Sequence, residues 1–382
     1  MKKALVLVYS DLRHDARVSR QLDFLSIDFQ VTAAAFGNND QPGHAYIDLH
    51  PDKLTFWRKL EIAFWSLARN YRRSWNCFHP ISEVGVRLQK GSWDLIVAND
   101  IDCLPLAFFI KGNSNAKVVV DAHEYSPLQF ENLLWWRLIF QPSINWICRT
   151  WLSQADLVFT VGTGLAEAYQ KNFGVHPMVI TNAPPYREIE PTPADPNRIK
   201  LVHHGIANPS RRPDLMFELM QHLDHRFELD LYLMTSGYAS GRTKNYIKEL
   251  KERFATNPRI RIHDPLPQHQ IVPTLNRYDL GIFLLPPINF NYANALPNKF
   301  FDFIQARLAV AIGPSPEMAR ILKDYGNGVI ADDFDPVTLA QKLNALTPEM
   351  VNRMKQQSVL AAQNLCAQKN GVIFREAIAR LF

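Results

Sequence analysis

The stretch NALPNKFFDF, residues 294–303, places a lysine and a carboxylate three residues apart just after a proline. Proline is suited to the first turn of a helix, where its missing N–H costs nothing, so the stretch predicts a helix from about residue 297 to about residue 307. Residues three apart share one helix face, so Lys299 and Asp302 should lie together near the helix N-terminus. The apolar side chains Phe300, Phe303 and Ile304 can point the other way, into a core. A positive helix end, a cation and an anion together suit a phosphate joined to a sugar diol.

Short apolar runs alternate with helical patterns along the whole chain. A first series of runs covers 4–9, 30–36, 94–99, 117–122 and 156–161, and a second covers 199–205, 228–234, 260–263, 279–285, 308–313 and 328–331. Continuously apolar strands separated by helices are typical of parallel sheets covered on both faces. The sequence therefore predicts an α/β chain of two Rossmann-like, doubly wound domains that face a central cleft, with ligands at the carboxyl ends of the strands.

The domain boundary is predicted from proline content. The chain has 382 residues, more than one core usually serves, and NAPPYREIEPTPADPN (182–197) carries five prolines in sixteen residues. We expect a first domain over 1–185, a stiff linker over 186–198 and a second domain over 199–382. The pattern leaves open whether the last helix, within GVIFREAIARLF (371–382), packs back on the first domain.

Composition indicates a cytoplasmic protein. The chain is 47% apolar, which is ordinary for a globular protein, and its four cysteines are scattered without C-x-x-C spacing. The apolar run at the N-terminus is too short for a signal peptide. The longer apolar stretch at 133–152 is broken by Arg137, Pro142 and Arg149, so it is a poor membrane-spanning helix.

A second basic segment follows the first strand of the second domain. It reads HHGIANPSRRPDLMFELM (203–220), in which Gly205 permits close backbone approach and Arg211 and Arg212 precede a helix that Pro213 can open. Guanidinium groups beside a helix N-terminus suit a pyrophosphate. A solvated basic loop is the alternative. Lys299 and Asp302 follow a later strand of the same predicted sheet, which favours the pyrophosphate.

The segment YANALPNKFFDFIQARLAVAI (292–312) resembles the donor-site motif of GT-B glycosyltransferases, particularly glycosyltransferase family 4, whose members read close to PNKLFEYMAAGLPVI. Further similarities, in the family's order, are DARVSRQ (15–21), DAHEYS (121–126), ADLVFTV (155–161) and the G-x5-R spacing at 205–211. The ordered set covers nearly the whole chain. It implies transfer of a sugar from a nucleotide-diphosphate sugar, without a bound metal or other cofactor.

The resemblance assigns roles to donor-side residues. Asp302 matches the second glutamate of the family's E-x7-E motif, which bonds the nucleotide ribose, whereas the first glutamate falls at Asn294. Asn294 can bond a sugar hydroxyl but cannot act as a carboxylate nucleophile or base. Lys299 and Arg211 match the cations that hold the diphosphate, and we expect them to act in catalysis. Gly205 and Arg212 complete the predicted donor site.

The first domain is expected to bind the acceptor. His123 matches the histidine that contacts the donor sugar in similar enzymes, and we expect it to be catalytic; a merely structural histidine, satisfied by Glu124 or by backbone, is the alternative. The candidate acceptor-binding residues are Asp11, His14, Asp15, Arg17 and Glu124. Asp15 alternatively only caps the helix that follows it. A base at Asp11, His14 or Asp15 would matter in an inverting enzyme.

Two patterns that could suggest a metal site are discounted. Asp100 and Asp102 form an Asp-x-Asp motif, but it follows an apolar strand, so we expect these residues to cap a helix or face solvent. The histidines show no i, i+4 pair of the kind that binds zinc. The sequence therefore predicts no required metal.

All eight tryptophans lie between residues 57 and 151, and the segment 53–90 has eight Lys or Arg residues against Glu61 and Glu83, a net charge of +6 in a chain whose total is +5. Within 53–76, an apolar stripe recurs at spacings of three and four: Trp57, Leu60, Phe64, Leu67, Tyr71 and Trp75. Such helices lie in the interface of anionic bilayers. The alternative is a helix packed on its own sheet. Nucleic acid is not an expected partner.

The sequence thus predicts a cytoplasmic glycosyltransferase, peripheral on the inner face of the cytoplasmic membrane. It would transfer a sugar to a glycan or lipid-linked acceptor in bacterial-type cell-surface polysaccharide synthesis, with retention of configuration. The alternatives are a sugar-nucleotide epimerase of the same fold, or a non-catalytic scaffold that binds nucleotides or glycans.

Overall fold

The computed structural model describes residues 1–37, 44–49, 54–79, 83–234 and 241–382. The chain divides into two compact units. Unit 1 comprises Met1–Thr181, Asn289–Asn291 and Asn370–Phe382, and unit 2 comprises Asn182–Ile288 and Tyr292–Lys369. The proline-rich segment 186–198, expected to be a separate linker, is part of unit 2 because it bonds to it: the Thr192 hydroxyl donates to the Asn276 carbonyl at 3.0 Å, and the Ala194 N–H to the Asn352 side chain at 2.8 Å.

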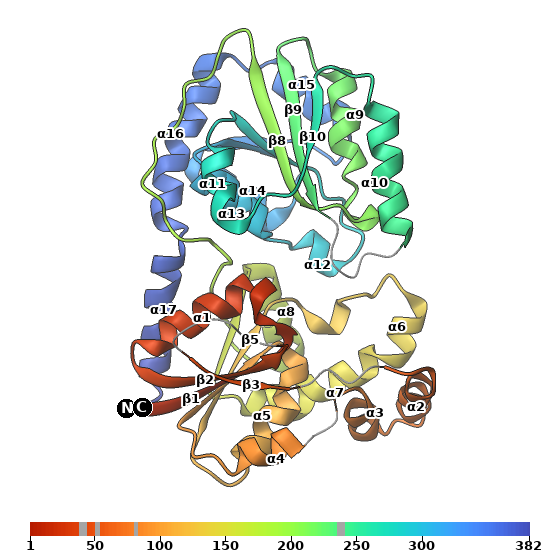
Figure 1. The fold of residues 1–382 in the computed structure, drawn as a ribbon, viewed down its shortest axis with the longest axis vertical. Coiled ribbons are helices and arrows are strands. Elements are labelled where there is room, and N and C mark those ends of the chain that lie inside the picture. The colour runs from red at the N-terminus through yellow and green to blue at the C-terminus, as the bar shows by residue number, and fades with distance from the viewer. Residues whose placement is uncertain (38–43, 50–53, 80–82, 235–240) are drawn as a thin grey trace. The chain divides into compact units, whose positions relative to one another are not determined.

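Unit 1 contains, among the described residues, a seven-stranded parallel sheet in the order β3-β2-β1-β4-β5-β6-β7 (Figure 1). Its strands are β1 (Lys2–Asp11), β2 (Phe29–Phe36), β3 (Ala45–Asp48), β4 (Leu95–Asn99), β5 (Lys117–Ala122), β6 (Leu157–Thr160) and β7 (Met178–Val179). Its helices are α1 (Ala16–Ser26), α2 (Phe56–Leu67), α3 (Tyr71–Phe78), α4 (Glu83–Gln89), α5 (Leu104–Lys111), α6 (Leu134–Ile139), α7 (Gln141–Trp151), α8 (Thr163–Phe173) and most of α17 (Ala367–Ala379).

Unit 2 contains, in the part of the chain that is described, a six-stranded parallel sheet in the order β10-β9-β8-β11-β12-β13. Its strands are β8 (Ile199–Ile206), β9 (Phe227–Met234), β10 (Ile260–His263), β11 (Leu280–Phe283), β12 (Ala309–Ile312) and β13 (Gly328–Ile330). Its helices are α9 (Asp214–His222), α10 (Gly241–Phe254), α11 (Gln268–Leu275), α13 (Asn298–Gln305), α14 (Pro316–Tyr325), α15 (Pro336–Asn344) and α16 (Pro348–Asn364), and the short α12 (Phe290–Ala293) is shared with unit 1.

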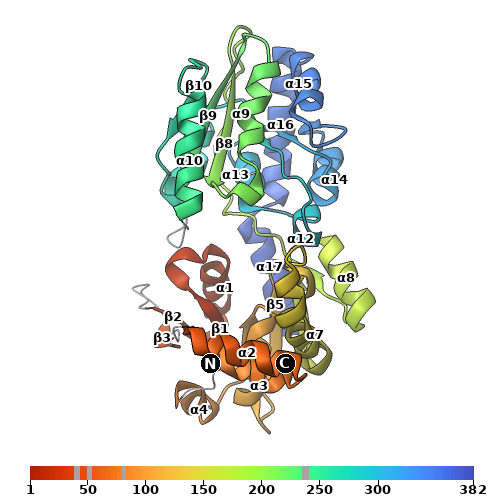
Figure 2. The same cartoon turned by 90° about the vertical axis from the view of Figure 1, so that its right-hand side faces the viewer.

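Helices cover both faces of each sheet, as Figures 1 and 2 show. In unit 1, one core packs α1 and the end of α17 on the sheet, and the other packs α3, α4, α5 and α7 on the opposite face. Phe374, Ala377 and Ile378 place α17 in the first of these cores. Both termini therefore lie in unit 1, where the Lys2 ammonium sits 3.8 Å from the centre of the Phe382 ring.

The segment 53–76, expected to be one helix, is interrupted in the structure. Helix α2 ends at Leu67, Arg69 adopts a left-handed φ of 57°, and α3 begins at Tyr71. The predicted stripe therefore ends at Leu67, and Trp75 is buried in unit 1. The break turns α3 into the core while α2 keeps its apolar face outside.

Helices α2 and α6 pack against each other and expose several apolar side chains, which we call the α2–α6 patch. The patch comprises Phe56, Trp57, Leu60, Phe64, Leu67, Leu134, Trp135 and Leu138. Trp57 is 77% exposed and Phe64 is 62% exposed, whereas Ile62 on the inner face of α2 is 2% exposed. The alternative that this stripe packs on its own sheet is wrong for α2. No helix among the described residues is both long and apolar enough to cross a bilayer.

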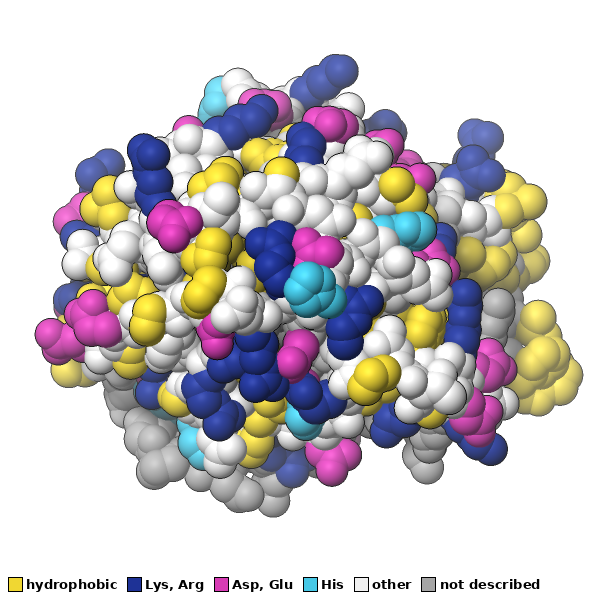
Figure 3. All heavy atoms as spheres, turned by 90° about the horizontal axis from the view of Figure 1, so that it is seen from above, with side chains coloured by type: hydrophobic (Ala, Val, Ile, Leu, Met, Phe, Trp, Pro, Cys, Tyr) yellow, Lys and Arg dark blue, Asp and Glu magenta, His cyan; other side chains and the backbone are white. Residues whose placement is uncertain are grey.

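Charged side chains elsewhere are mixed in sign. On the face of the molecule in Figure 3, lysines and arginines are interspersed with aspartates and glutamates. The basic excess of the sequence is local to the segment around α2 and α3.

Candidate functional site

The donor-side candidates of unit 2 meet where the strand order of its sheet reverses, between β8 and β11. Ligands of open α/β sheets bind at such switch points. His203 lies near the end of β8, and α13 carries Lys299 in its first turn. The Lys299 ammonium lies 3.2 Å from His203 Nε2, and it also sits 4.3 Å from the centre of the Phe283 ring. The switch point thus holds a buried lysine.

The tautomer of His203 follows from its contacts. Its Nδ1 lies 2.9 Å from the Ile282 carbonyl oxygen, which only accepts, so Nδ1 carries the proton and Nε2 accepts from Lys299. Burial and the charge of Lys299 hold the pKa of His203 well below its ordinary value. His203 is therefore a neutral positioning group for the lysine.

Lys299 is 5% exposed. Burial and the neighbouring charge of Arg211 lower its pKa well below the ordinary value, while Asp302 opposes this shift. Isolated buried charges are costly unless they are paired, so an arriving anion would relieve both burial and repulsion. Lys299 and Arg211 are thus two basic side chains close enough to interact electrostatically, an arrangement suited to an anion.

Gly205 and Asp302 complete this arrangement. Gly205 has a φ of 125°, and a Cβ there would lie 3.1 Å from both Cε and Nζ of Lys299. Glycine thus leaves room for the lysine. Asp302 lies one helical turn from Lys299, as predicted, and its Oδ2 is 3.4 Å from His204 Nε2. Burial lowers the pKa of His204 to about 3, so this ring is neutral.

The remaining donor-side candidates are placed differently. Arg211 ends a short 3-10 turn, and its charge reaches Lys299 and His203. Arg212 is exposed and pairs with Asp214 at 2.7 Å. Asn294 is half-buried between α12 and α13. Arg212 therefore already forms an ion pair with Asp214. Arg211 instead lies close enough to Lys299 for its charge to lower the pKa of the lysine.

In unit 1, the candidates gather after β4 and β5. The buried Arg17 donates to Asp121 from Nε at 2.8 Å and from Nη2 at 2.6 Å, and its Nη1 donates to the Ile180 carbonyl at 2.9 Å. His123 lies 3.5 Å from Asp121 and 3.5 Å from Asp100. Arg17 thus holds Asp121, and the two aspartates flank His123.

Asp100 carries backbone strain. It has a φ of 66° and a ψ of 159°, a conformation that costs a non-glycine residue about 1–3 kcal/mol. Its carboxylate caps no helix and instead accepts the His123 backbone N–H at 3.0 Å. Of the two expectations for Asp100, helix capping is therefore wrong, whereas exposure to solvent is confirmed, since 42% of its side-chain surface is exposed. This backbone conformation places the Asp100 carboxylate against His123.

The two groups shift each other's pKa. Burial would lower the pKa of His123, but Asp100 and Asp121 raise it to about 9. Burial raises the pKa of Asp100 to about 6, with smaller contributions from Asp102 and Glu124, while His123 opposes the rise. At neutral pH His123 is therefore an imidazolium, which donates hydrogen bonds and cannot act as a base.

The other acceptor-side candidates lie at the end of β1 or beyond β5. Asp11 pairs with Arg13 at 2.5 Å, and His14 is exposed. Asp15 caps α1 by accepting the Val18 N–H, which is the structural role offered as its alternative. Glu124 has an exposed side chain close to His123. Glu124 directly follows His123 in the chain, whereas Asp11 and Asp15 each bond to a nearby residue.

Comparison with solved structures fits this architecture. Anabaena HepE in complex with UDP-glucose is similar over 100% of both chains, with a TM-score of 0.71 and 14% identity. Sucrose-phosphate synthase from Thermosynechococcus elongatus matches over 100% of this chain and 99% of its own, with a TM-score of 0.72 and 11% identity. An α,α-trehalose-phosphate synthase (UDP-forming) from Burkholderia vietnamiensis matches over 100% and 99%, with a TM-score of 0.66 and 10% identity. The chain has the GT-B fold.

The GT-B resemblance predicted from the sequence is confirmed at the level of fold, as is the prediction of two doubly wound α/β domains. The sequence matches no protein-family model and no curated protein. At 10–14% identity, the similarity establishes the fold alone. The role of each residue has to be inferred from the geometry of the site.

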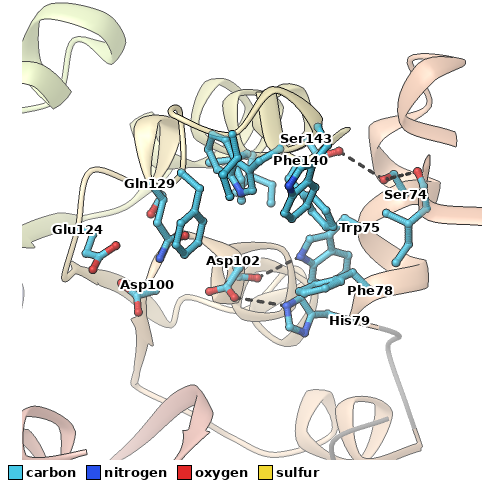
Figure 4. A pocket seen from close by; sticks show the side chains of 18 of the residues that line it. Ser74, Trp75, Phe78, His79, Asp100, Asp102, Glu124, Gln129, Phe140 and Ser143 are labelled. Carbon is cyan, nitrogen blue, oxygen red and sulfur yellow. Dashed lines mark hydrogen bonds and ion pairs between the residues drawn. The ribbon is translucent and has the colours of Figure 1, made fainter. Parts of the chain in front are cut away.

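One polar cluster of this GT-B chain was missed by sequence reasoning. Asp102 lies 3.3 Å from His79 Nε2, and its backbone carbonyl accepts from the Trp75 indole at 3.2 Å. Figure 4 shows Asp102 beside these two rings, with Asp100 and Glu124 further along the same pocket. Two aspartates directly after a buried strand were the available signal.

Among the described residues, no group of three or more His, Cys, Asp or Glu side chains could hold a metal ion.

Proposed function

We propose that this chain is a glycosyltransferase that moves a sugar from a nucleotide-diphosphate sugar to a glycan or lipid-linked acceptor, without a metal. The observation that carries the proposal is the buried Lys299 at the switch point of unit 2, held by His203 and accompanied by Arg211. The full-length structural similarity to HepE, which was solved with UDP-glucose, supports this class of donor. Bacterial-type cell-surface polysaccharide synthesis is the proposed context.

The proposed chemistry is stabilisation of the leaving group. As the bond between the sugar and the β-phosphate breaks, negative charge builds on the phosphate. The positive charges of Lys299 and Arg211 would stabilise it. Asp302 would accept hydrogen bonds from the ribose. His123, a cation at neutral pH, is assigned contact with the transferred sugar as a hydrogen-bond donor. Because Asn294 supplies no carboxylate nucleophile, a retaining reaction in this chain would proceed without a covalent intermediate at that position.

Peripheral membrane binding on the cytoplasmic side is part of the proposal. The α2–α6 patch exposes apolar side chains, and Lys59, Arg69, Arg72, Arg73 and Arg137 on or beside these helices are exposed as well. Amphipathic helices of this kind insert their apolar face at the interface, while their cations attract anionic lipid. A lipid-linked acceptor would be met at the same surface.

The decisive experiment is a screen of nucleotide sugars by thermal shift, followed by product analysis with the donor that binds. A bound donor raises the apparent stability because it binds the folded state alone. Transfer of the sugar to an added glycan or glycolipid supports the proposal. An epimerised nucleotide sugar, or binding without any product, would reject it.

A further inference from the structure

Unit 1 contains a pocket of about 550 Å³ that lies beyond the carboxyl ends of β4 and β5. This volume is in the range of pockets that hold small organic molecules. Its walls come mainly from α2, α3, α6, α7 and the residues beside α6, and they are mainly apolar; among them are Phe78, Phe130, Leu133, Trp135, Phe140 and Ile144. A concave site of this size with mainly apolar walls is the usual kind of place for a small-molecule ligand.

The charged side chains of the pocket lie at one end, and Ser74 and Ser143 add hydroxyls among the apolar walls. Asp100, Asp102, His123 and Glu124 line the charged end; in Figure 4, Asp100 and Glu124 lie apart from the rings of Phe78 and Phe140, whereas Asp102 lies beside Trp75 and His79. His79 also lines this end beside Asp102, so the three carboxylates leave a net negative charge even with both histidines protonated. This end therefore repels phosphate groups and offers acceptors for hydroxyl hydrogens.

The apolar end adjoins the protein surface. Phe130 and Trp135 line the pocket and are also exposed, and Trp135 belongs to the α2–α6 patch. Trp135 thus belongs to both the pocket wall and the exposed patch.

We propose that this pocket binds the apolar chain of an amphiphilic acceptor whose uncharged, hydroxyl-bearing head lies at Asp100, Asp102 and Glu124. The inference rests on the proposed function, because it names the acceptor class of the same enzyme. It favours a neutral glycolipid over a lipid whose phosphate lies at the head. Each methylene buried in the pocket should strengthen binding about three- to fourfold.

Alkyl glucosides test the proposal by isothermal titration calorimetry, at concentrations below those at which they form micelles. Octyl glucoside should bind saturably, hexyl glucoside about tenfold more weakly, and methyl glucoside without detectable heat. Octyl phosphate should bind at least tenfold more weakly than octyl glucoside because of the carboxylates. Equal affinities for hexyl and octyl glucoside, or for octyl phosphate and octyl glucoside, would overturn the proposal.

Variants separate the pocket from the surface patch. Leu133→Trp and Ile144→Trp each fill the pocket, and each should weaken octyl glucoside binding at least tenfold. Leu138→Trp is the matched control, because Leu138 is exposed on α6 and does not line the pocket. Circular dichroism melting identifies any variant that fails to fold, so that the other filling variant decides. Loss of binding in Leu138→Trp with retention in the folded filling variants would show adsorption to the surface, and would reject the pocket.

The same samples distinguish this inference from the proposed function. Binding of nucleoside diphosphates depends on unit 2, and octyl glucoside binding depends on unit 1. Glucoside binding without binding of any nucleoside diphosphate would reject the glycosyltransferase and leave an amphiphile-binding pocket. Nucleoside diphosphate binding without glucoside binding would reject the pocket alone.

Discussion

Lys299 donates a hydrogen bond to Nε2 of His203 over 3.2 Å, at the point where the strand order of the second sheet reverses. The proton of His203 is committed to the Ile282 carbonyl, so the ring can only accept from the lysine. This contact fixes the lysine amine without placing a negative charge beside it. A diphosphate would supply the missing negative charge.

Replacing Lys299 tests that role. Lys299→Ala should lower turnover at least about a hundredfold, which is the scale seen when one preorganised charge-stabilising group is removed. Turnover is measured with saturating donor, under conditions in which chemistry limits the rate. Lys323→Ala is the control because Lys323 is exposed on α14 of the same unit. Wild-type turnover of folded Lys299→Ala would refute the leaving-group role.

Asp302→Asn should act mainly on donor affinity. A ribose contact is made in both the ground state and the transition state, so its loss weakens binding and leaves the maximal rate nearly unchanged. Donor affinity and turnover at saturation are measured separately. Asp324→Asn, an exposed change on α14, should alter neither. A fall in the maximal rate alone would assign Asp302 to the chemical step instead.

The sequence predicted every strand of the second sheet and missed two of the first. All eleven apolar runs form strands, including the partly buried edge strands β10 and β13, whereas β3 contains only four residues, one of them Asp48, and β7 only two, which are too few to form a recognisable apolar run. Lys299 and Asp302 could be placed together from the sequence because one helix carries both. The contacts of Lys299 with His203 and of Asp100 with His123 join residues that are far apart in the chain, so no local pattern could predict them.

The break between α2 and α3 shows a further limit of periodicity. Leu67 and Trp75 fit one helical stripe in sequence, but the left-handed Arg69 redirects the chain between them. A non-glycine residue with positive φ is stabilised by the surrounding fold rather than by its own preference. Neither Arg69 nor Asp100 gives a sequence signal for such a conformation.

Activity should be independent of a divalent metal. The proposed chemistry uses Lys299 and Arg211 to oppose the charge on the leaving phosphate, so a chelator should leave the initial rate unchanged. The measurement compares rates with EDTA, and with EDTA followed by excess magnesium or manganese. Loss of activity with EDTA and its recovery with either metal would instead assign a metal role to Asp100 and Asp102.

The pKa of His123 predicts how the stability of unit 1 depends on pH. Its pKa of about 9 lies above the unfolded value of about 6.5, so its stabilisation is complete below about pH 6.5 and is lost as pH rises through 9. The free energy of unfolding of unit 1 should therefore fall by about 2 to 3 kcal/mol over this window. All eight tryptophans lie in unit 1, so their fluorescence during urea unfolding reports on this unit.

His123→Asn should remove most of that pH dependence. The groups facing His123 are Asp100, Asp121 and Arg17, and Asp100, with its pKa of about 6, is largely ionised above pH 7. His14→Asn is the control, since His14 is exposed. The same decline in His123→Asn as in the wild type would show that another group titrates.

The α2–α6 patch predicts binding to anionic vesicles. The purified protein should sediment with vesicles that contain anionic lipid, and it should be released as salt rises, because exposed charges are screened over about 8 Å at physiological ionic strength. Arg69, Arg72 and Arg73 are exposed at the break and on α3. Changing all three to Gln should remove about 1 kcal/mol of attraction per charge. Equal vesicle binding by this variant and the wild type would eliminate the electrostatic contribution.

A matched pair on α2 separates membrane contact from folding. Phe64 is 62% exposed and Ile62 is 2% exposed, although they lie two residues apart. Phe64→Ser should weaken vesicle binding and leave the urea midpoint of unit 1 nearly unchanged, because its ring lies outside the core. Ile62→Ser should lower that midpoint, because it places a hydroxyl and a cavity in a buried position. If Phe64→Ser unfolds the protein without lipid and leaves vesicle binding of the folded fraction unchanged, Phe64 is a core residue, and the apolar contact with the membrane must lie elsewhere.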